Sequence, residues 1–152
     1  MDAMNNGGTR QIEMKTKWFF SVWLVSSIMM YGLSFVWHGV LLNDYMSIKY
    51  PMWMYFTLAA VVYLVIGFVL TYLYHYTYTH RIKYKGMLLG ACLGFFIYLM
   101  AFVLGVSFNP NSLEHTVVDF LWQMFEQGVG GAAIGAVMRF LVDMDRFEKA
   151  DA

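Results

Sequence analysis

The sequence predicts an all-α integral membrane protein whose four transmembrane helices form an up-down bundle. Three observations predict this fold class. The 152-residue chain is 60% hydrophobic, 19% aromatic and only 13% charged, which is more apolar side chain than a soluble domain of this length could bury. Four apolar stretches each reach the roughly 20 residues that cross a bilayer. None of these stretches carries a lysine or arginine in its interior.

The four spans are expected at 18–42, 52–74, 87–106 and about 117–138. The first is too long for a signal-peptide core and lacks a small-x-small cleavage site, so we expect it to stay in place as a membrane anchor. Pro51 fits the first turn of the second helix, where a missing N–H is harmless. Because the connections are short, sequential helices should be antiparallel neighbours.

The basic residues predict the orientation of these spans. Nine of the ten Lys and Arg residues lie before the first span, between the second and third, or after the fourth. By the positive-inside rule both termini and the middle loop are then cytoplasmic. The expected organisation is an N-terminal tail at 1–17, a transmembrane domain at 18–142 and a C-terminal tail at 143–152. The formal net charge of zero leaves no basic face for a nucleic acid.

Small residues recur at helical spacing on the third and fourth spans. Such faces let two helix backbones approach closely and associate through van der Waals contact. They could pack within the monomer or against a second copy or a partner subunit, and the sequence does not decide between these. The candidate packing residues are Gly86, Gly90, Gly94, Gly128, Gly131 and Gly135.

Two stripes of mostly polar residues share the spacing i, i+4, i+7 and i+11, which places each stripe on one helix face. The first runs through Ser27, Tyr31, Ser34 and His38, and the second through Asp119, Gln123, Glu126 and Gly130. Both stripes could face the bundle interior. They would then line a path from the non-cytoplasmic surface towards the centre of the bilayer.

Glu126 is the most informative residue of the chain, because a carboxylate deep in hydrocarbon is costly and marks a functional-site candidate. One interpretation is structural: a protonated carboxyl that donates a hydrogen bond to a neighbouring helix. The other is functional. In a dry site we expect Glu126 to be protonated, His38 to be neutral, and the two to be linked by a hydrogen bond or one water. His38 alone is otherwise an ordinary interfacial histidine.

Motifs for cofactors and catalysis are weak. A haem would need two histidines at similar depth, and only His38 and His115 share a side. Zinc would need three or four converging ligands, for which His38, His115, Asp119 and Glu126 are possible members without diagnostic spacing. There is no HExxH, CxxC, phosphate loop or nucleophile elbow. We therefore expect no cofactor and no enzymatic activity, and the metal question stays open.

The end of the first helix, GLSFVWHGVLLNDYM, is followed by three more spans and a glycine-rich last helix. This pattern resembles a family of small four-span bacterial membrane proteins of unknown function, whose first helix typically ends in an aromatic-Tyr-Gly-Pro-Leu-Phe type sequence. Here His38 replaces that tyrosine and Val40 the proline. The resemblance covers most of Trp18 to Val142. It implies a four-span fold in a bacterial inner membrane, and it gives no information about an activity.

Two functional hypotheses follow from the sequence. The first is a non-enzymatic accessory subunit or homo-oligomer that packs through its glycine-rich helices, with the lipid bilayer, other membrane subunits or itself as partners. The second is a proton, ion or small-solute pathway, or a cofactor site, built on His38 and Glu126 with Gln123, Asp119, Ser34 and Tyr31. Removal of the Glu126 charge should cost only stability under the first hypothesis and should abolish a pH-dependent activity under the second.

Overall fold

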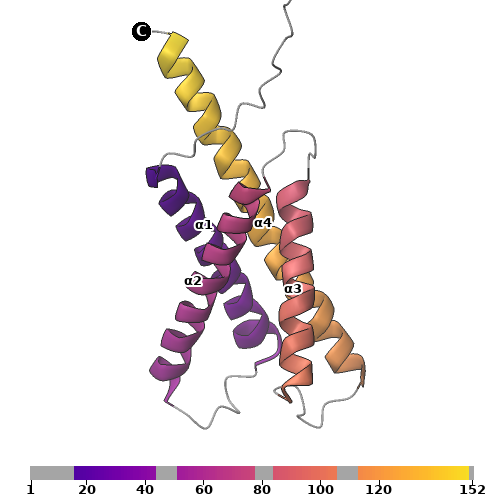
Figure 1. The fold of residues 1–152 in the computed structure, drawn as a ribbon. Coiled ribbons are helices and arrows are strands. Elements are labelled where there is room, and N and C mark those ends of the chain that lie inside the picture. Colours follow the sequence, from indigo (N-terminus) through magenta and orange to yellow (C-terminus); the bar gives the residue numbers. More distant parts are fainter. Residues whose placement is uncertain (1–15, 44–50, 78–83, 106–112, 151–152) are drawn as a thin grey trace, which may run out of the picture.

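The computed structural model describes residues 16–43, 51–77, 84–105 and 113–150, and every regular element in these ranges is helical (Figure 1). The all-α prediction is therefore confirmed for this part of the chain. In chain order the elements are α1 Thr16–Phe35, the π-helical turn η1 Val36–Leu41, α2 Met52–Tyr76, α3 Lys85–Val103 and α4 Leu113–Ala150.

Three segments are long and apolar enough to cross a membrane. They are Trp18–Leu41, which joins α1 to η1, Met52–Tyr76 and Lys85–Val103, with 24, 25 and 19 residues. They correspond to the first three expected spans. The fourth expected span lies inside α4, whose 38 residues extend over about 57 Å at 1.5 Å per residue. The middle of α4 is less apolar than the other helices because it contains three polar residues within one and a half turns, Gln123, Glu126 and Gln127.

Successive helices alternate in direction, so each end of the molecule gathers two helix starts and two helix ends (Figure 1). At one end, here called the Tyr84 end, lie the start of α1, the end of α2 and the start of α3; α4 passes them and projects beyond. At the opposite end, the η1 end, lie η1 and the starts of α2 and α4. The most extensive contacts join α4 to α3 and α1, and α1 to α2, so α4 has neighbours on two sides.

An apolar cluster fills the interior in the half nearer the Tyr84 end. It consists of Val22, Met30, Leu70, Tyr74, Ile134 and Met138. Most other large apolar side chains, such as Ile28, Val65 and Leu88, are exposed. A soluble monomer rarely exposes apolar surface so widely, which agrees with lipid as the surrounding solvent.

The glycines of α3 contact the backbone of α4 directly. A Cβ atom added at Gly86 would collide with the carbonyl group of Gly131, and one added at Gly90 would collide with that of Gln127. At Gly94 the added atom would lie 2.6 Å from the carbonyl oxygen of Gln123. No side chain separates the two helices at these levels, so any larger residue would force them apart.

The other two candidate packing glycines of α4 have more room. A Cβ atom at Gly128 would lie 3.5 Å from the carbonyl oxygen of Met87, which is ordinary van der Waals contact. At Gly135 it would lie 3.6 Å from the hydroxyl oxygen of Tyr74, a residue of α2. Of these three glycines of α4, Gly131 therefore lies closest to the backbone of α3.

Two hydrogen bonds fix α1 against its neighbours. The Trp23 indole N–H donates to the backbone carbonyl of Leu64 in α2 at 2.7 Å. The buried Ser26 hydroxyl donates to the carbonyl of Gly130 in α4 at 3.1 Å. Bonds of this kind between membrane helices are worth about 0.6 kcal/mol on average, so they set the register of α1 more than they hold the bundle together.

Candidate functional site

Glu126 and Gln127 form the polar centre of the bundle. Both side chains are fully buried, and the Gln127 side-chain amide donates to Glu126 Oε1 at 3.2 Å. Adjacent helical residues point about 100° apart. They are buried together because α4 is covered on two sides, with the backbone of Gln127 against Gly90 of α3.

Two aromatic residues complete the surroundings of the carboxyl group. The hydroxyl group of Tyr63, in α2, interacts with both the Glu126 carboxyl and the Ser34 hydroxyl of α1. The Trp122 indole lies near the same carboxyl, although its N–H does not reach hydrogen-bond geometry with any acceptor. Three helices thus supply the polar groups around Glu126.

Several buried polar atoms of this cluster have no hydrogen-bond partner within the described ranges. They are Glu126 Oε2, Gln127 Oε1 and Trp122 Nε1. Each such atom costs about 1–3 kcal/mol when it is desolvated and unpaired. A proton on Glu126 Oε2 would turn one unpaired acceptor into a donor. The Glu126 carboxyl can therefore take up or release a proton at Oε2.

Further polar groups lead from Glu126 to the η1 end. The Trp37 ring of η1 stacks on Trp122 with ring centroids 4.1 Å apart and planes 10° from parallel. The Trp37 indole N–H donates to Asp119 Oδ1 at 3.4 Å. The other carboxylate oxygen, Asp119 Oδ2, lies 3.9 Å from His115 Nε2. The His115 and Asp119 side chains are 40% and 26% exposed, whereas Glu126 is fully buried. Polar groups thus occur from the surface of α4 inward.

The π-helical turn η1 places Trp37 against α4. Its widened hydrogen bonding is seen where the Leu42 N–H donates to the Trp37 carbonyl, five residues back, at 2.9 Å. One extra residue in a turn rotates the residues on either side of it relative to each other, and such turns are frequent at functional sites. Trp37 lies seven residues after Met30 and eleven after Ser26, both of which contact Gly130 of α4, so it shares their helix face. From there it contacts Asp119 and Trp122.

The structure brings together only part of the predicted polar site. Ser34 and Glu126 meet through Tyr63, and the Tyr31 ring packs edge-on against Tyr63 with centroids 6.0 Å apart. The side chains that interact with Glu126 in the described ranges are Tyr63, Trp122 and Gln127. His38 lies half-buried in η1, and its predicted pairing with Glu126 stays a prediction. Tyr63 of α2 is a partner of the Glu126 carboxyl that the polar stripes did not include.

The other two polar members of the predicted stripe on α4 are Gln123 and Asp119. Gln123 is half-buried, and its backbone carbonyl faces Gly94. Asp119 contacts Trp37 and His115. The residues that sequence reasoning missed are Tyr63, Trp122, Gln127 and Trp37. For Tyr63 a signal was present, since it is a tyrosine in the aliphatic run VVYLVI far from either interfacial belt.

No group of three or more His, Cys, Asp or Glu side chains gathers at metal-ligand distances in the described part of the chain. The chain matches no family model, no curated protein and no solved structure.

Proposed function

We propose that this chain is a four-span integral membrane protein in which Glu126 forms a proton-binding site that communicates with the η1 end. The observation that carries the proposal is the fully buried Glu126 carboxyl, whose Oε2 has no partner beside the equally unpartnered Gln127 Oε1. An intramembrane carboxyl of this kind is characteristic of proton pathways.

The fourth span is supported by the way α4 distributes its polar residues. Glu126 and Gln127 are buried against the other helices, while Leu121 and Phe125 on the outer side are exposed. The outer surface of α4 at this level is therefore apolar, as lipid contact requires. The polar residues lower the overall hydropathy of α4 without presenting charge to lipid.

The orientation follows from the cations. Lys85, Arg139 and Arg146 lie at the Tyr84 end or on the projecting part of α4, so the positive-inside rule makes that end cytoplasmic. The η1 end then faces the opposite side. A bacterial inner membrane is the location that we propose, from the resemblance described above.

The site should exchange protons with one side only. On the η1 side, His115 and Asp119 lie next to the Trp37–Trp122 stack that borders Glu126. In the other direction the apolar cluster begins one helical turn beyond Glu126, where Gly130 contacts Met30. The buried hydroxyl groups of that half form no hydrogen-bonded chain to Glu126 in the described ranges: Ser26 and Ser27 each donate to a backbone carbonyl, and Thr71 Oγ1 has no partner. The arrangement supports a binding or sensing site that faces one side, rather than an open channel.

A proton fits this site better than a larger cation, because a proton needs only one carboxyl oxygen. The accessory-subunit hypothesis from the sequence stays a prediction. The glycine faces on which it rested are packed against each other inside the monomer, so a partner subunit would have to use another surface.

The decisive experiment is infrared difference spectroscopy of the full chain in lipid bilayers during pH jumps. Wild type should show a protonated-carboxyl band that titrates reversibly and disappears in Glu126→Gln. Glu114→Gln serves as the control, since Glu114 is exposed at the start of α4, and should leave the band intact. If the band survives in Glu126→Gln, or if wild type shows no titrating buried carboxyl, the proposal is wrong.

A further inference from the structure

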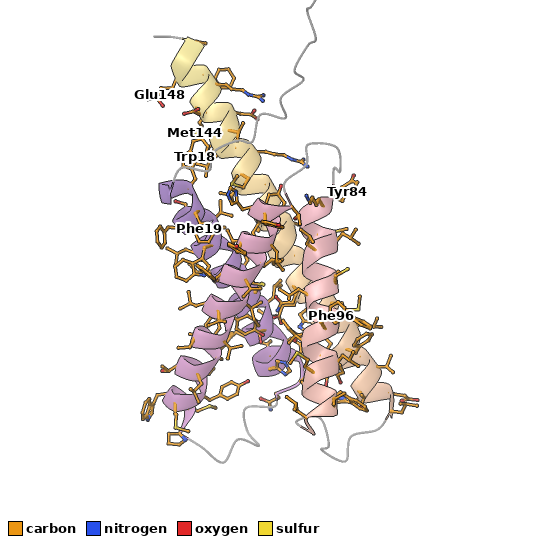
Figure 2. The ribbon with its side chains drawn as sticks, viewed as in Figure 1. Trp18, Phe19, Tyr84, Phe96, Met144 and Glu148 are labelled. Atoms are coloured by element: carbon orange, nitrogen blue, oxygen red, sulfur yellow. The ribbon has the colours of Figure 1, made fainter. Side chains whose placement is uncertain are left out.

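A second polar site lies at the Tyr84 end, away from Glu126. A cavity of about 170 Å³ opens there between the start of α3 and the second half of α4. Its walls include Tyr74, Tyr84, Lys85 and Arg139, and its floor is formed by small residues of α4 such as Gly135 and Ala136. Figure 2 shows Tyr84 directly before the first turn of α3.

The chemistry of the lining favours an anion. Two basic side chains come from two different helices, two tyrosine residues add hydroxyl groups, and no acidic residue is among those that line the cavity. The first turn of α3 adds backbone N–H groups, because no side chain caps this helix and the first N–H groups of a helix have no acceptor within it. A helix start of this kind attracts a negative group that other features already hold nearby.

The size of the cavity limits the ligand. Pockets for drug-sized molecules begin at roughly 300 Å³, so this cavity is suited to a phosphate group and its nearest atoms. The floor is open because Gly135 and Ala136 carry little or no side chain there. The Lys85 and Arg139 side chains supply the two charges that a phosphate oxygen pair would contact.

The surroundings favour a phosphate that belongs to a lipid. Met87, which also lines the cavity, and its neighbour Leu88 are exposed apolar residues on α3. Acyl chains attached to a bound phosphate could lie along this surface. The cavity also lies at the end of a span and next to aromatic residues, at the level where headgroups are found. Basic pockets between helices on the cytoplasmic side are known to bind anionic headgroups.

We propose that this cavity binds the phosphate of an anionic phospholipid headgroup, with Lys85 and Arg139 as its two cationic contacts. The site depends on the membrane placement of the chain but not on the Glu126 site. Glu126→Gln should therefore leave lipid binding unchanged, and failure of one proposal does not imply failure of the other.

The test is native mass spectrometry of the purified full chain titrated with phosphatidylglycerol and, separately, with phosphatidylcholine. Wild type should bind phosphatidylglycerol more tightly. Each basic contact near a membrane surface is expected to contribute roughly fivefold in affinity, so Lys85→Gln with Arg139→Gln should remove most of the preference. Arg146→Gln is the matched control, because Arg146 lies on the same helix, outside the cavity, paired with Asp143 at 3.6 Å.

Two further measurements test whether the lipid binds in this cavity and through its lipid part. Ala136→Phe should fill the cavity and reduce binding without any change in charge, which also covers the case in which the double variant does not fold. Inorganic phosphate in large excess should fail to displace phosphatidylglycerol. The proposal is overturned if the two lipids bind equally, if Arg146→Gln costs as much as Arg139→Gln, if Ala136→Phe has no effect, or if inorganic phosphate displaces the lipid.

Discussion

The indole rings of Trp37 and Trp122 stack 4.1 Å apart and nearly parallel, at 10°, and this contact joins the π-helical turn to α4 one helical turn before Glu126. Trp37 also donates to Asp119. One side chain therefore contacts both the surface polar pair and the residue that borders the buried carboxyl. It is the point at which access to Glu126 from the η1 end would be controlled.

Replacement of Trp37 by alanine should weaken the contact between η1 and α4. A stacked aromatic pair is worth about 0.5–1.5 kcal/mol beyond its buried area, and part of that area is lost as well, so we expect Trp37→Ala to cost about 1–3 kcal/mol in unfolding free energy. The Glu126 carboxyl should also exchange its proton for deuterium faster, as measured by infrared spectroscopy. Trp53→Ala is the control, because Trp53 is 71% exposed. Equal effects of the two changes would contradict the role of the stack.

The glycines should differ sharply in their tolerance of a single methyl group. Gly90→Ala would drive a Cβ atom into the Gln127 carbonyl, so α3 and α4 must separate and the thermal stability in mild detergent should fall. At Gly32 nothing lies within 4 Å of an added Cβ, and Gly32→Ala should be neutral or stabilising by up to about 1 kcal/mol, the helix-propensity difference.

Larger substitutions extend the same comparison. Gly90→Leu and Gly131→Leu should damage folding far more than Gly32→Leu, since Gly32 is exposed and no atom of the described residues lies within 4 Å of a Cβ atom there. The measurement is the fraction of monomer that survives size-exclusion chromatography after heating. Similar losses at all three positions would mean that α3 and α4 do not depend on direct backbone contact.

The helices were predictable from sequence, whereas their mutual rotation was not. Composition and run length determine that the three segments from Trp18 to Val103 form long apolar helices, because a bilayer sets the required length. The close approach of Gly90 and Gly131 to the opposite backbone follows the small-residue spacing. The residues of the polar cluster could not be predicted from the periodicity of single helices. Tyr63 and Gln127 reach Glu126 only when α4 is covered on two sides, and one-helix periodicity does not encode which faces meet.

The π-helical turn explains the difference at His38. A stripe drawn at uniform α-helical spacing places His38 in line with Ser34, but η1 begins at Val36, so that spacing does not hold through His38. No local residue preference marks such a turn in advance. Trp37, which the stripe excluded, is an η1 residue that contacts α4.

Substitutions at Glu126 should separate its hydrogen bonds from its proton. Glu126→Gln keeps a carbonyl oxygen for the Gln127 amide and should preserve the unfolding free energy closely. Glu126→Leu leaves the Gln127 amide without its acceptor and removes one of the side chains that interact with the Tyr63 hydroxyl, so it should cost about 1–3 kcal/mol. Denaturant titration in detergent micelles measures both. If Glu126→Leu is as stable as wild type, the cluster does not depend on this side chain.

The proposed topology predicts which positions a membrane-impermeant thiol reagent reaches in intact cells. Single cysteines would be placed in a Cys92→Ala background, because Cys92 is exposed in the structure. Asn43 and Leu113 lie at the η1 end and should be labelled. Tyr76 and Glu148 lie at the Tyr84 end or beyond it and should be labelled only after the cells are opened.

This pattern depends on α4 crossing the membrane, since only a fourth span places Leu113 and Glu148 on opposite sides. The comparison of these two positions therefore tests the span that hydropathy alone does not reveal. A cysteine at Asn43 reports on the first span independently and is the internal control. Labelling of both Leu113→Cys and Glu148→Cys in intact cells would rule out the fourth span, and with it a Glu126 site within the bilayer.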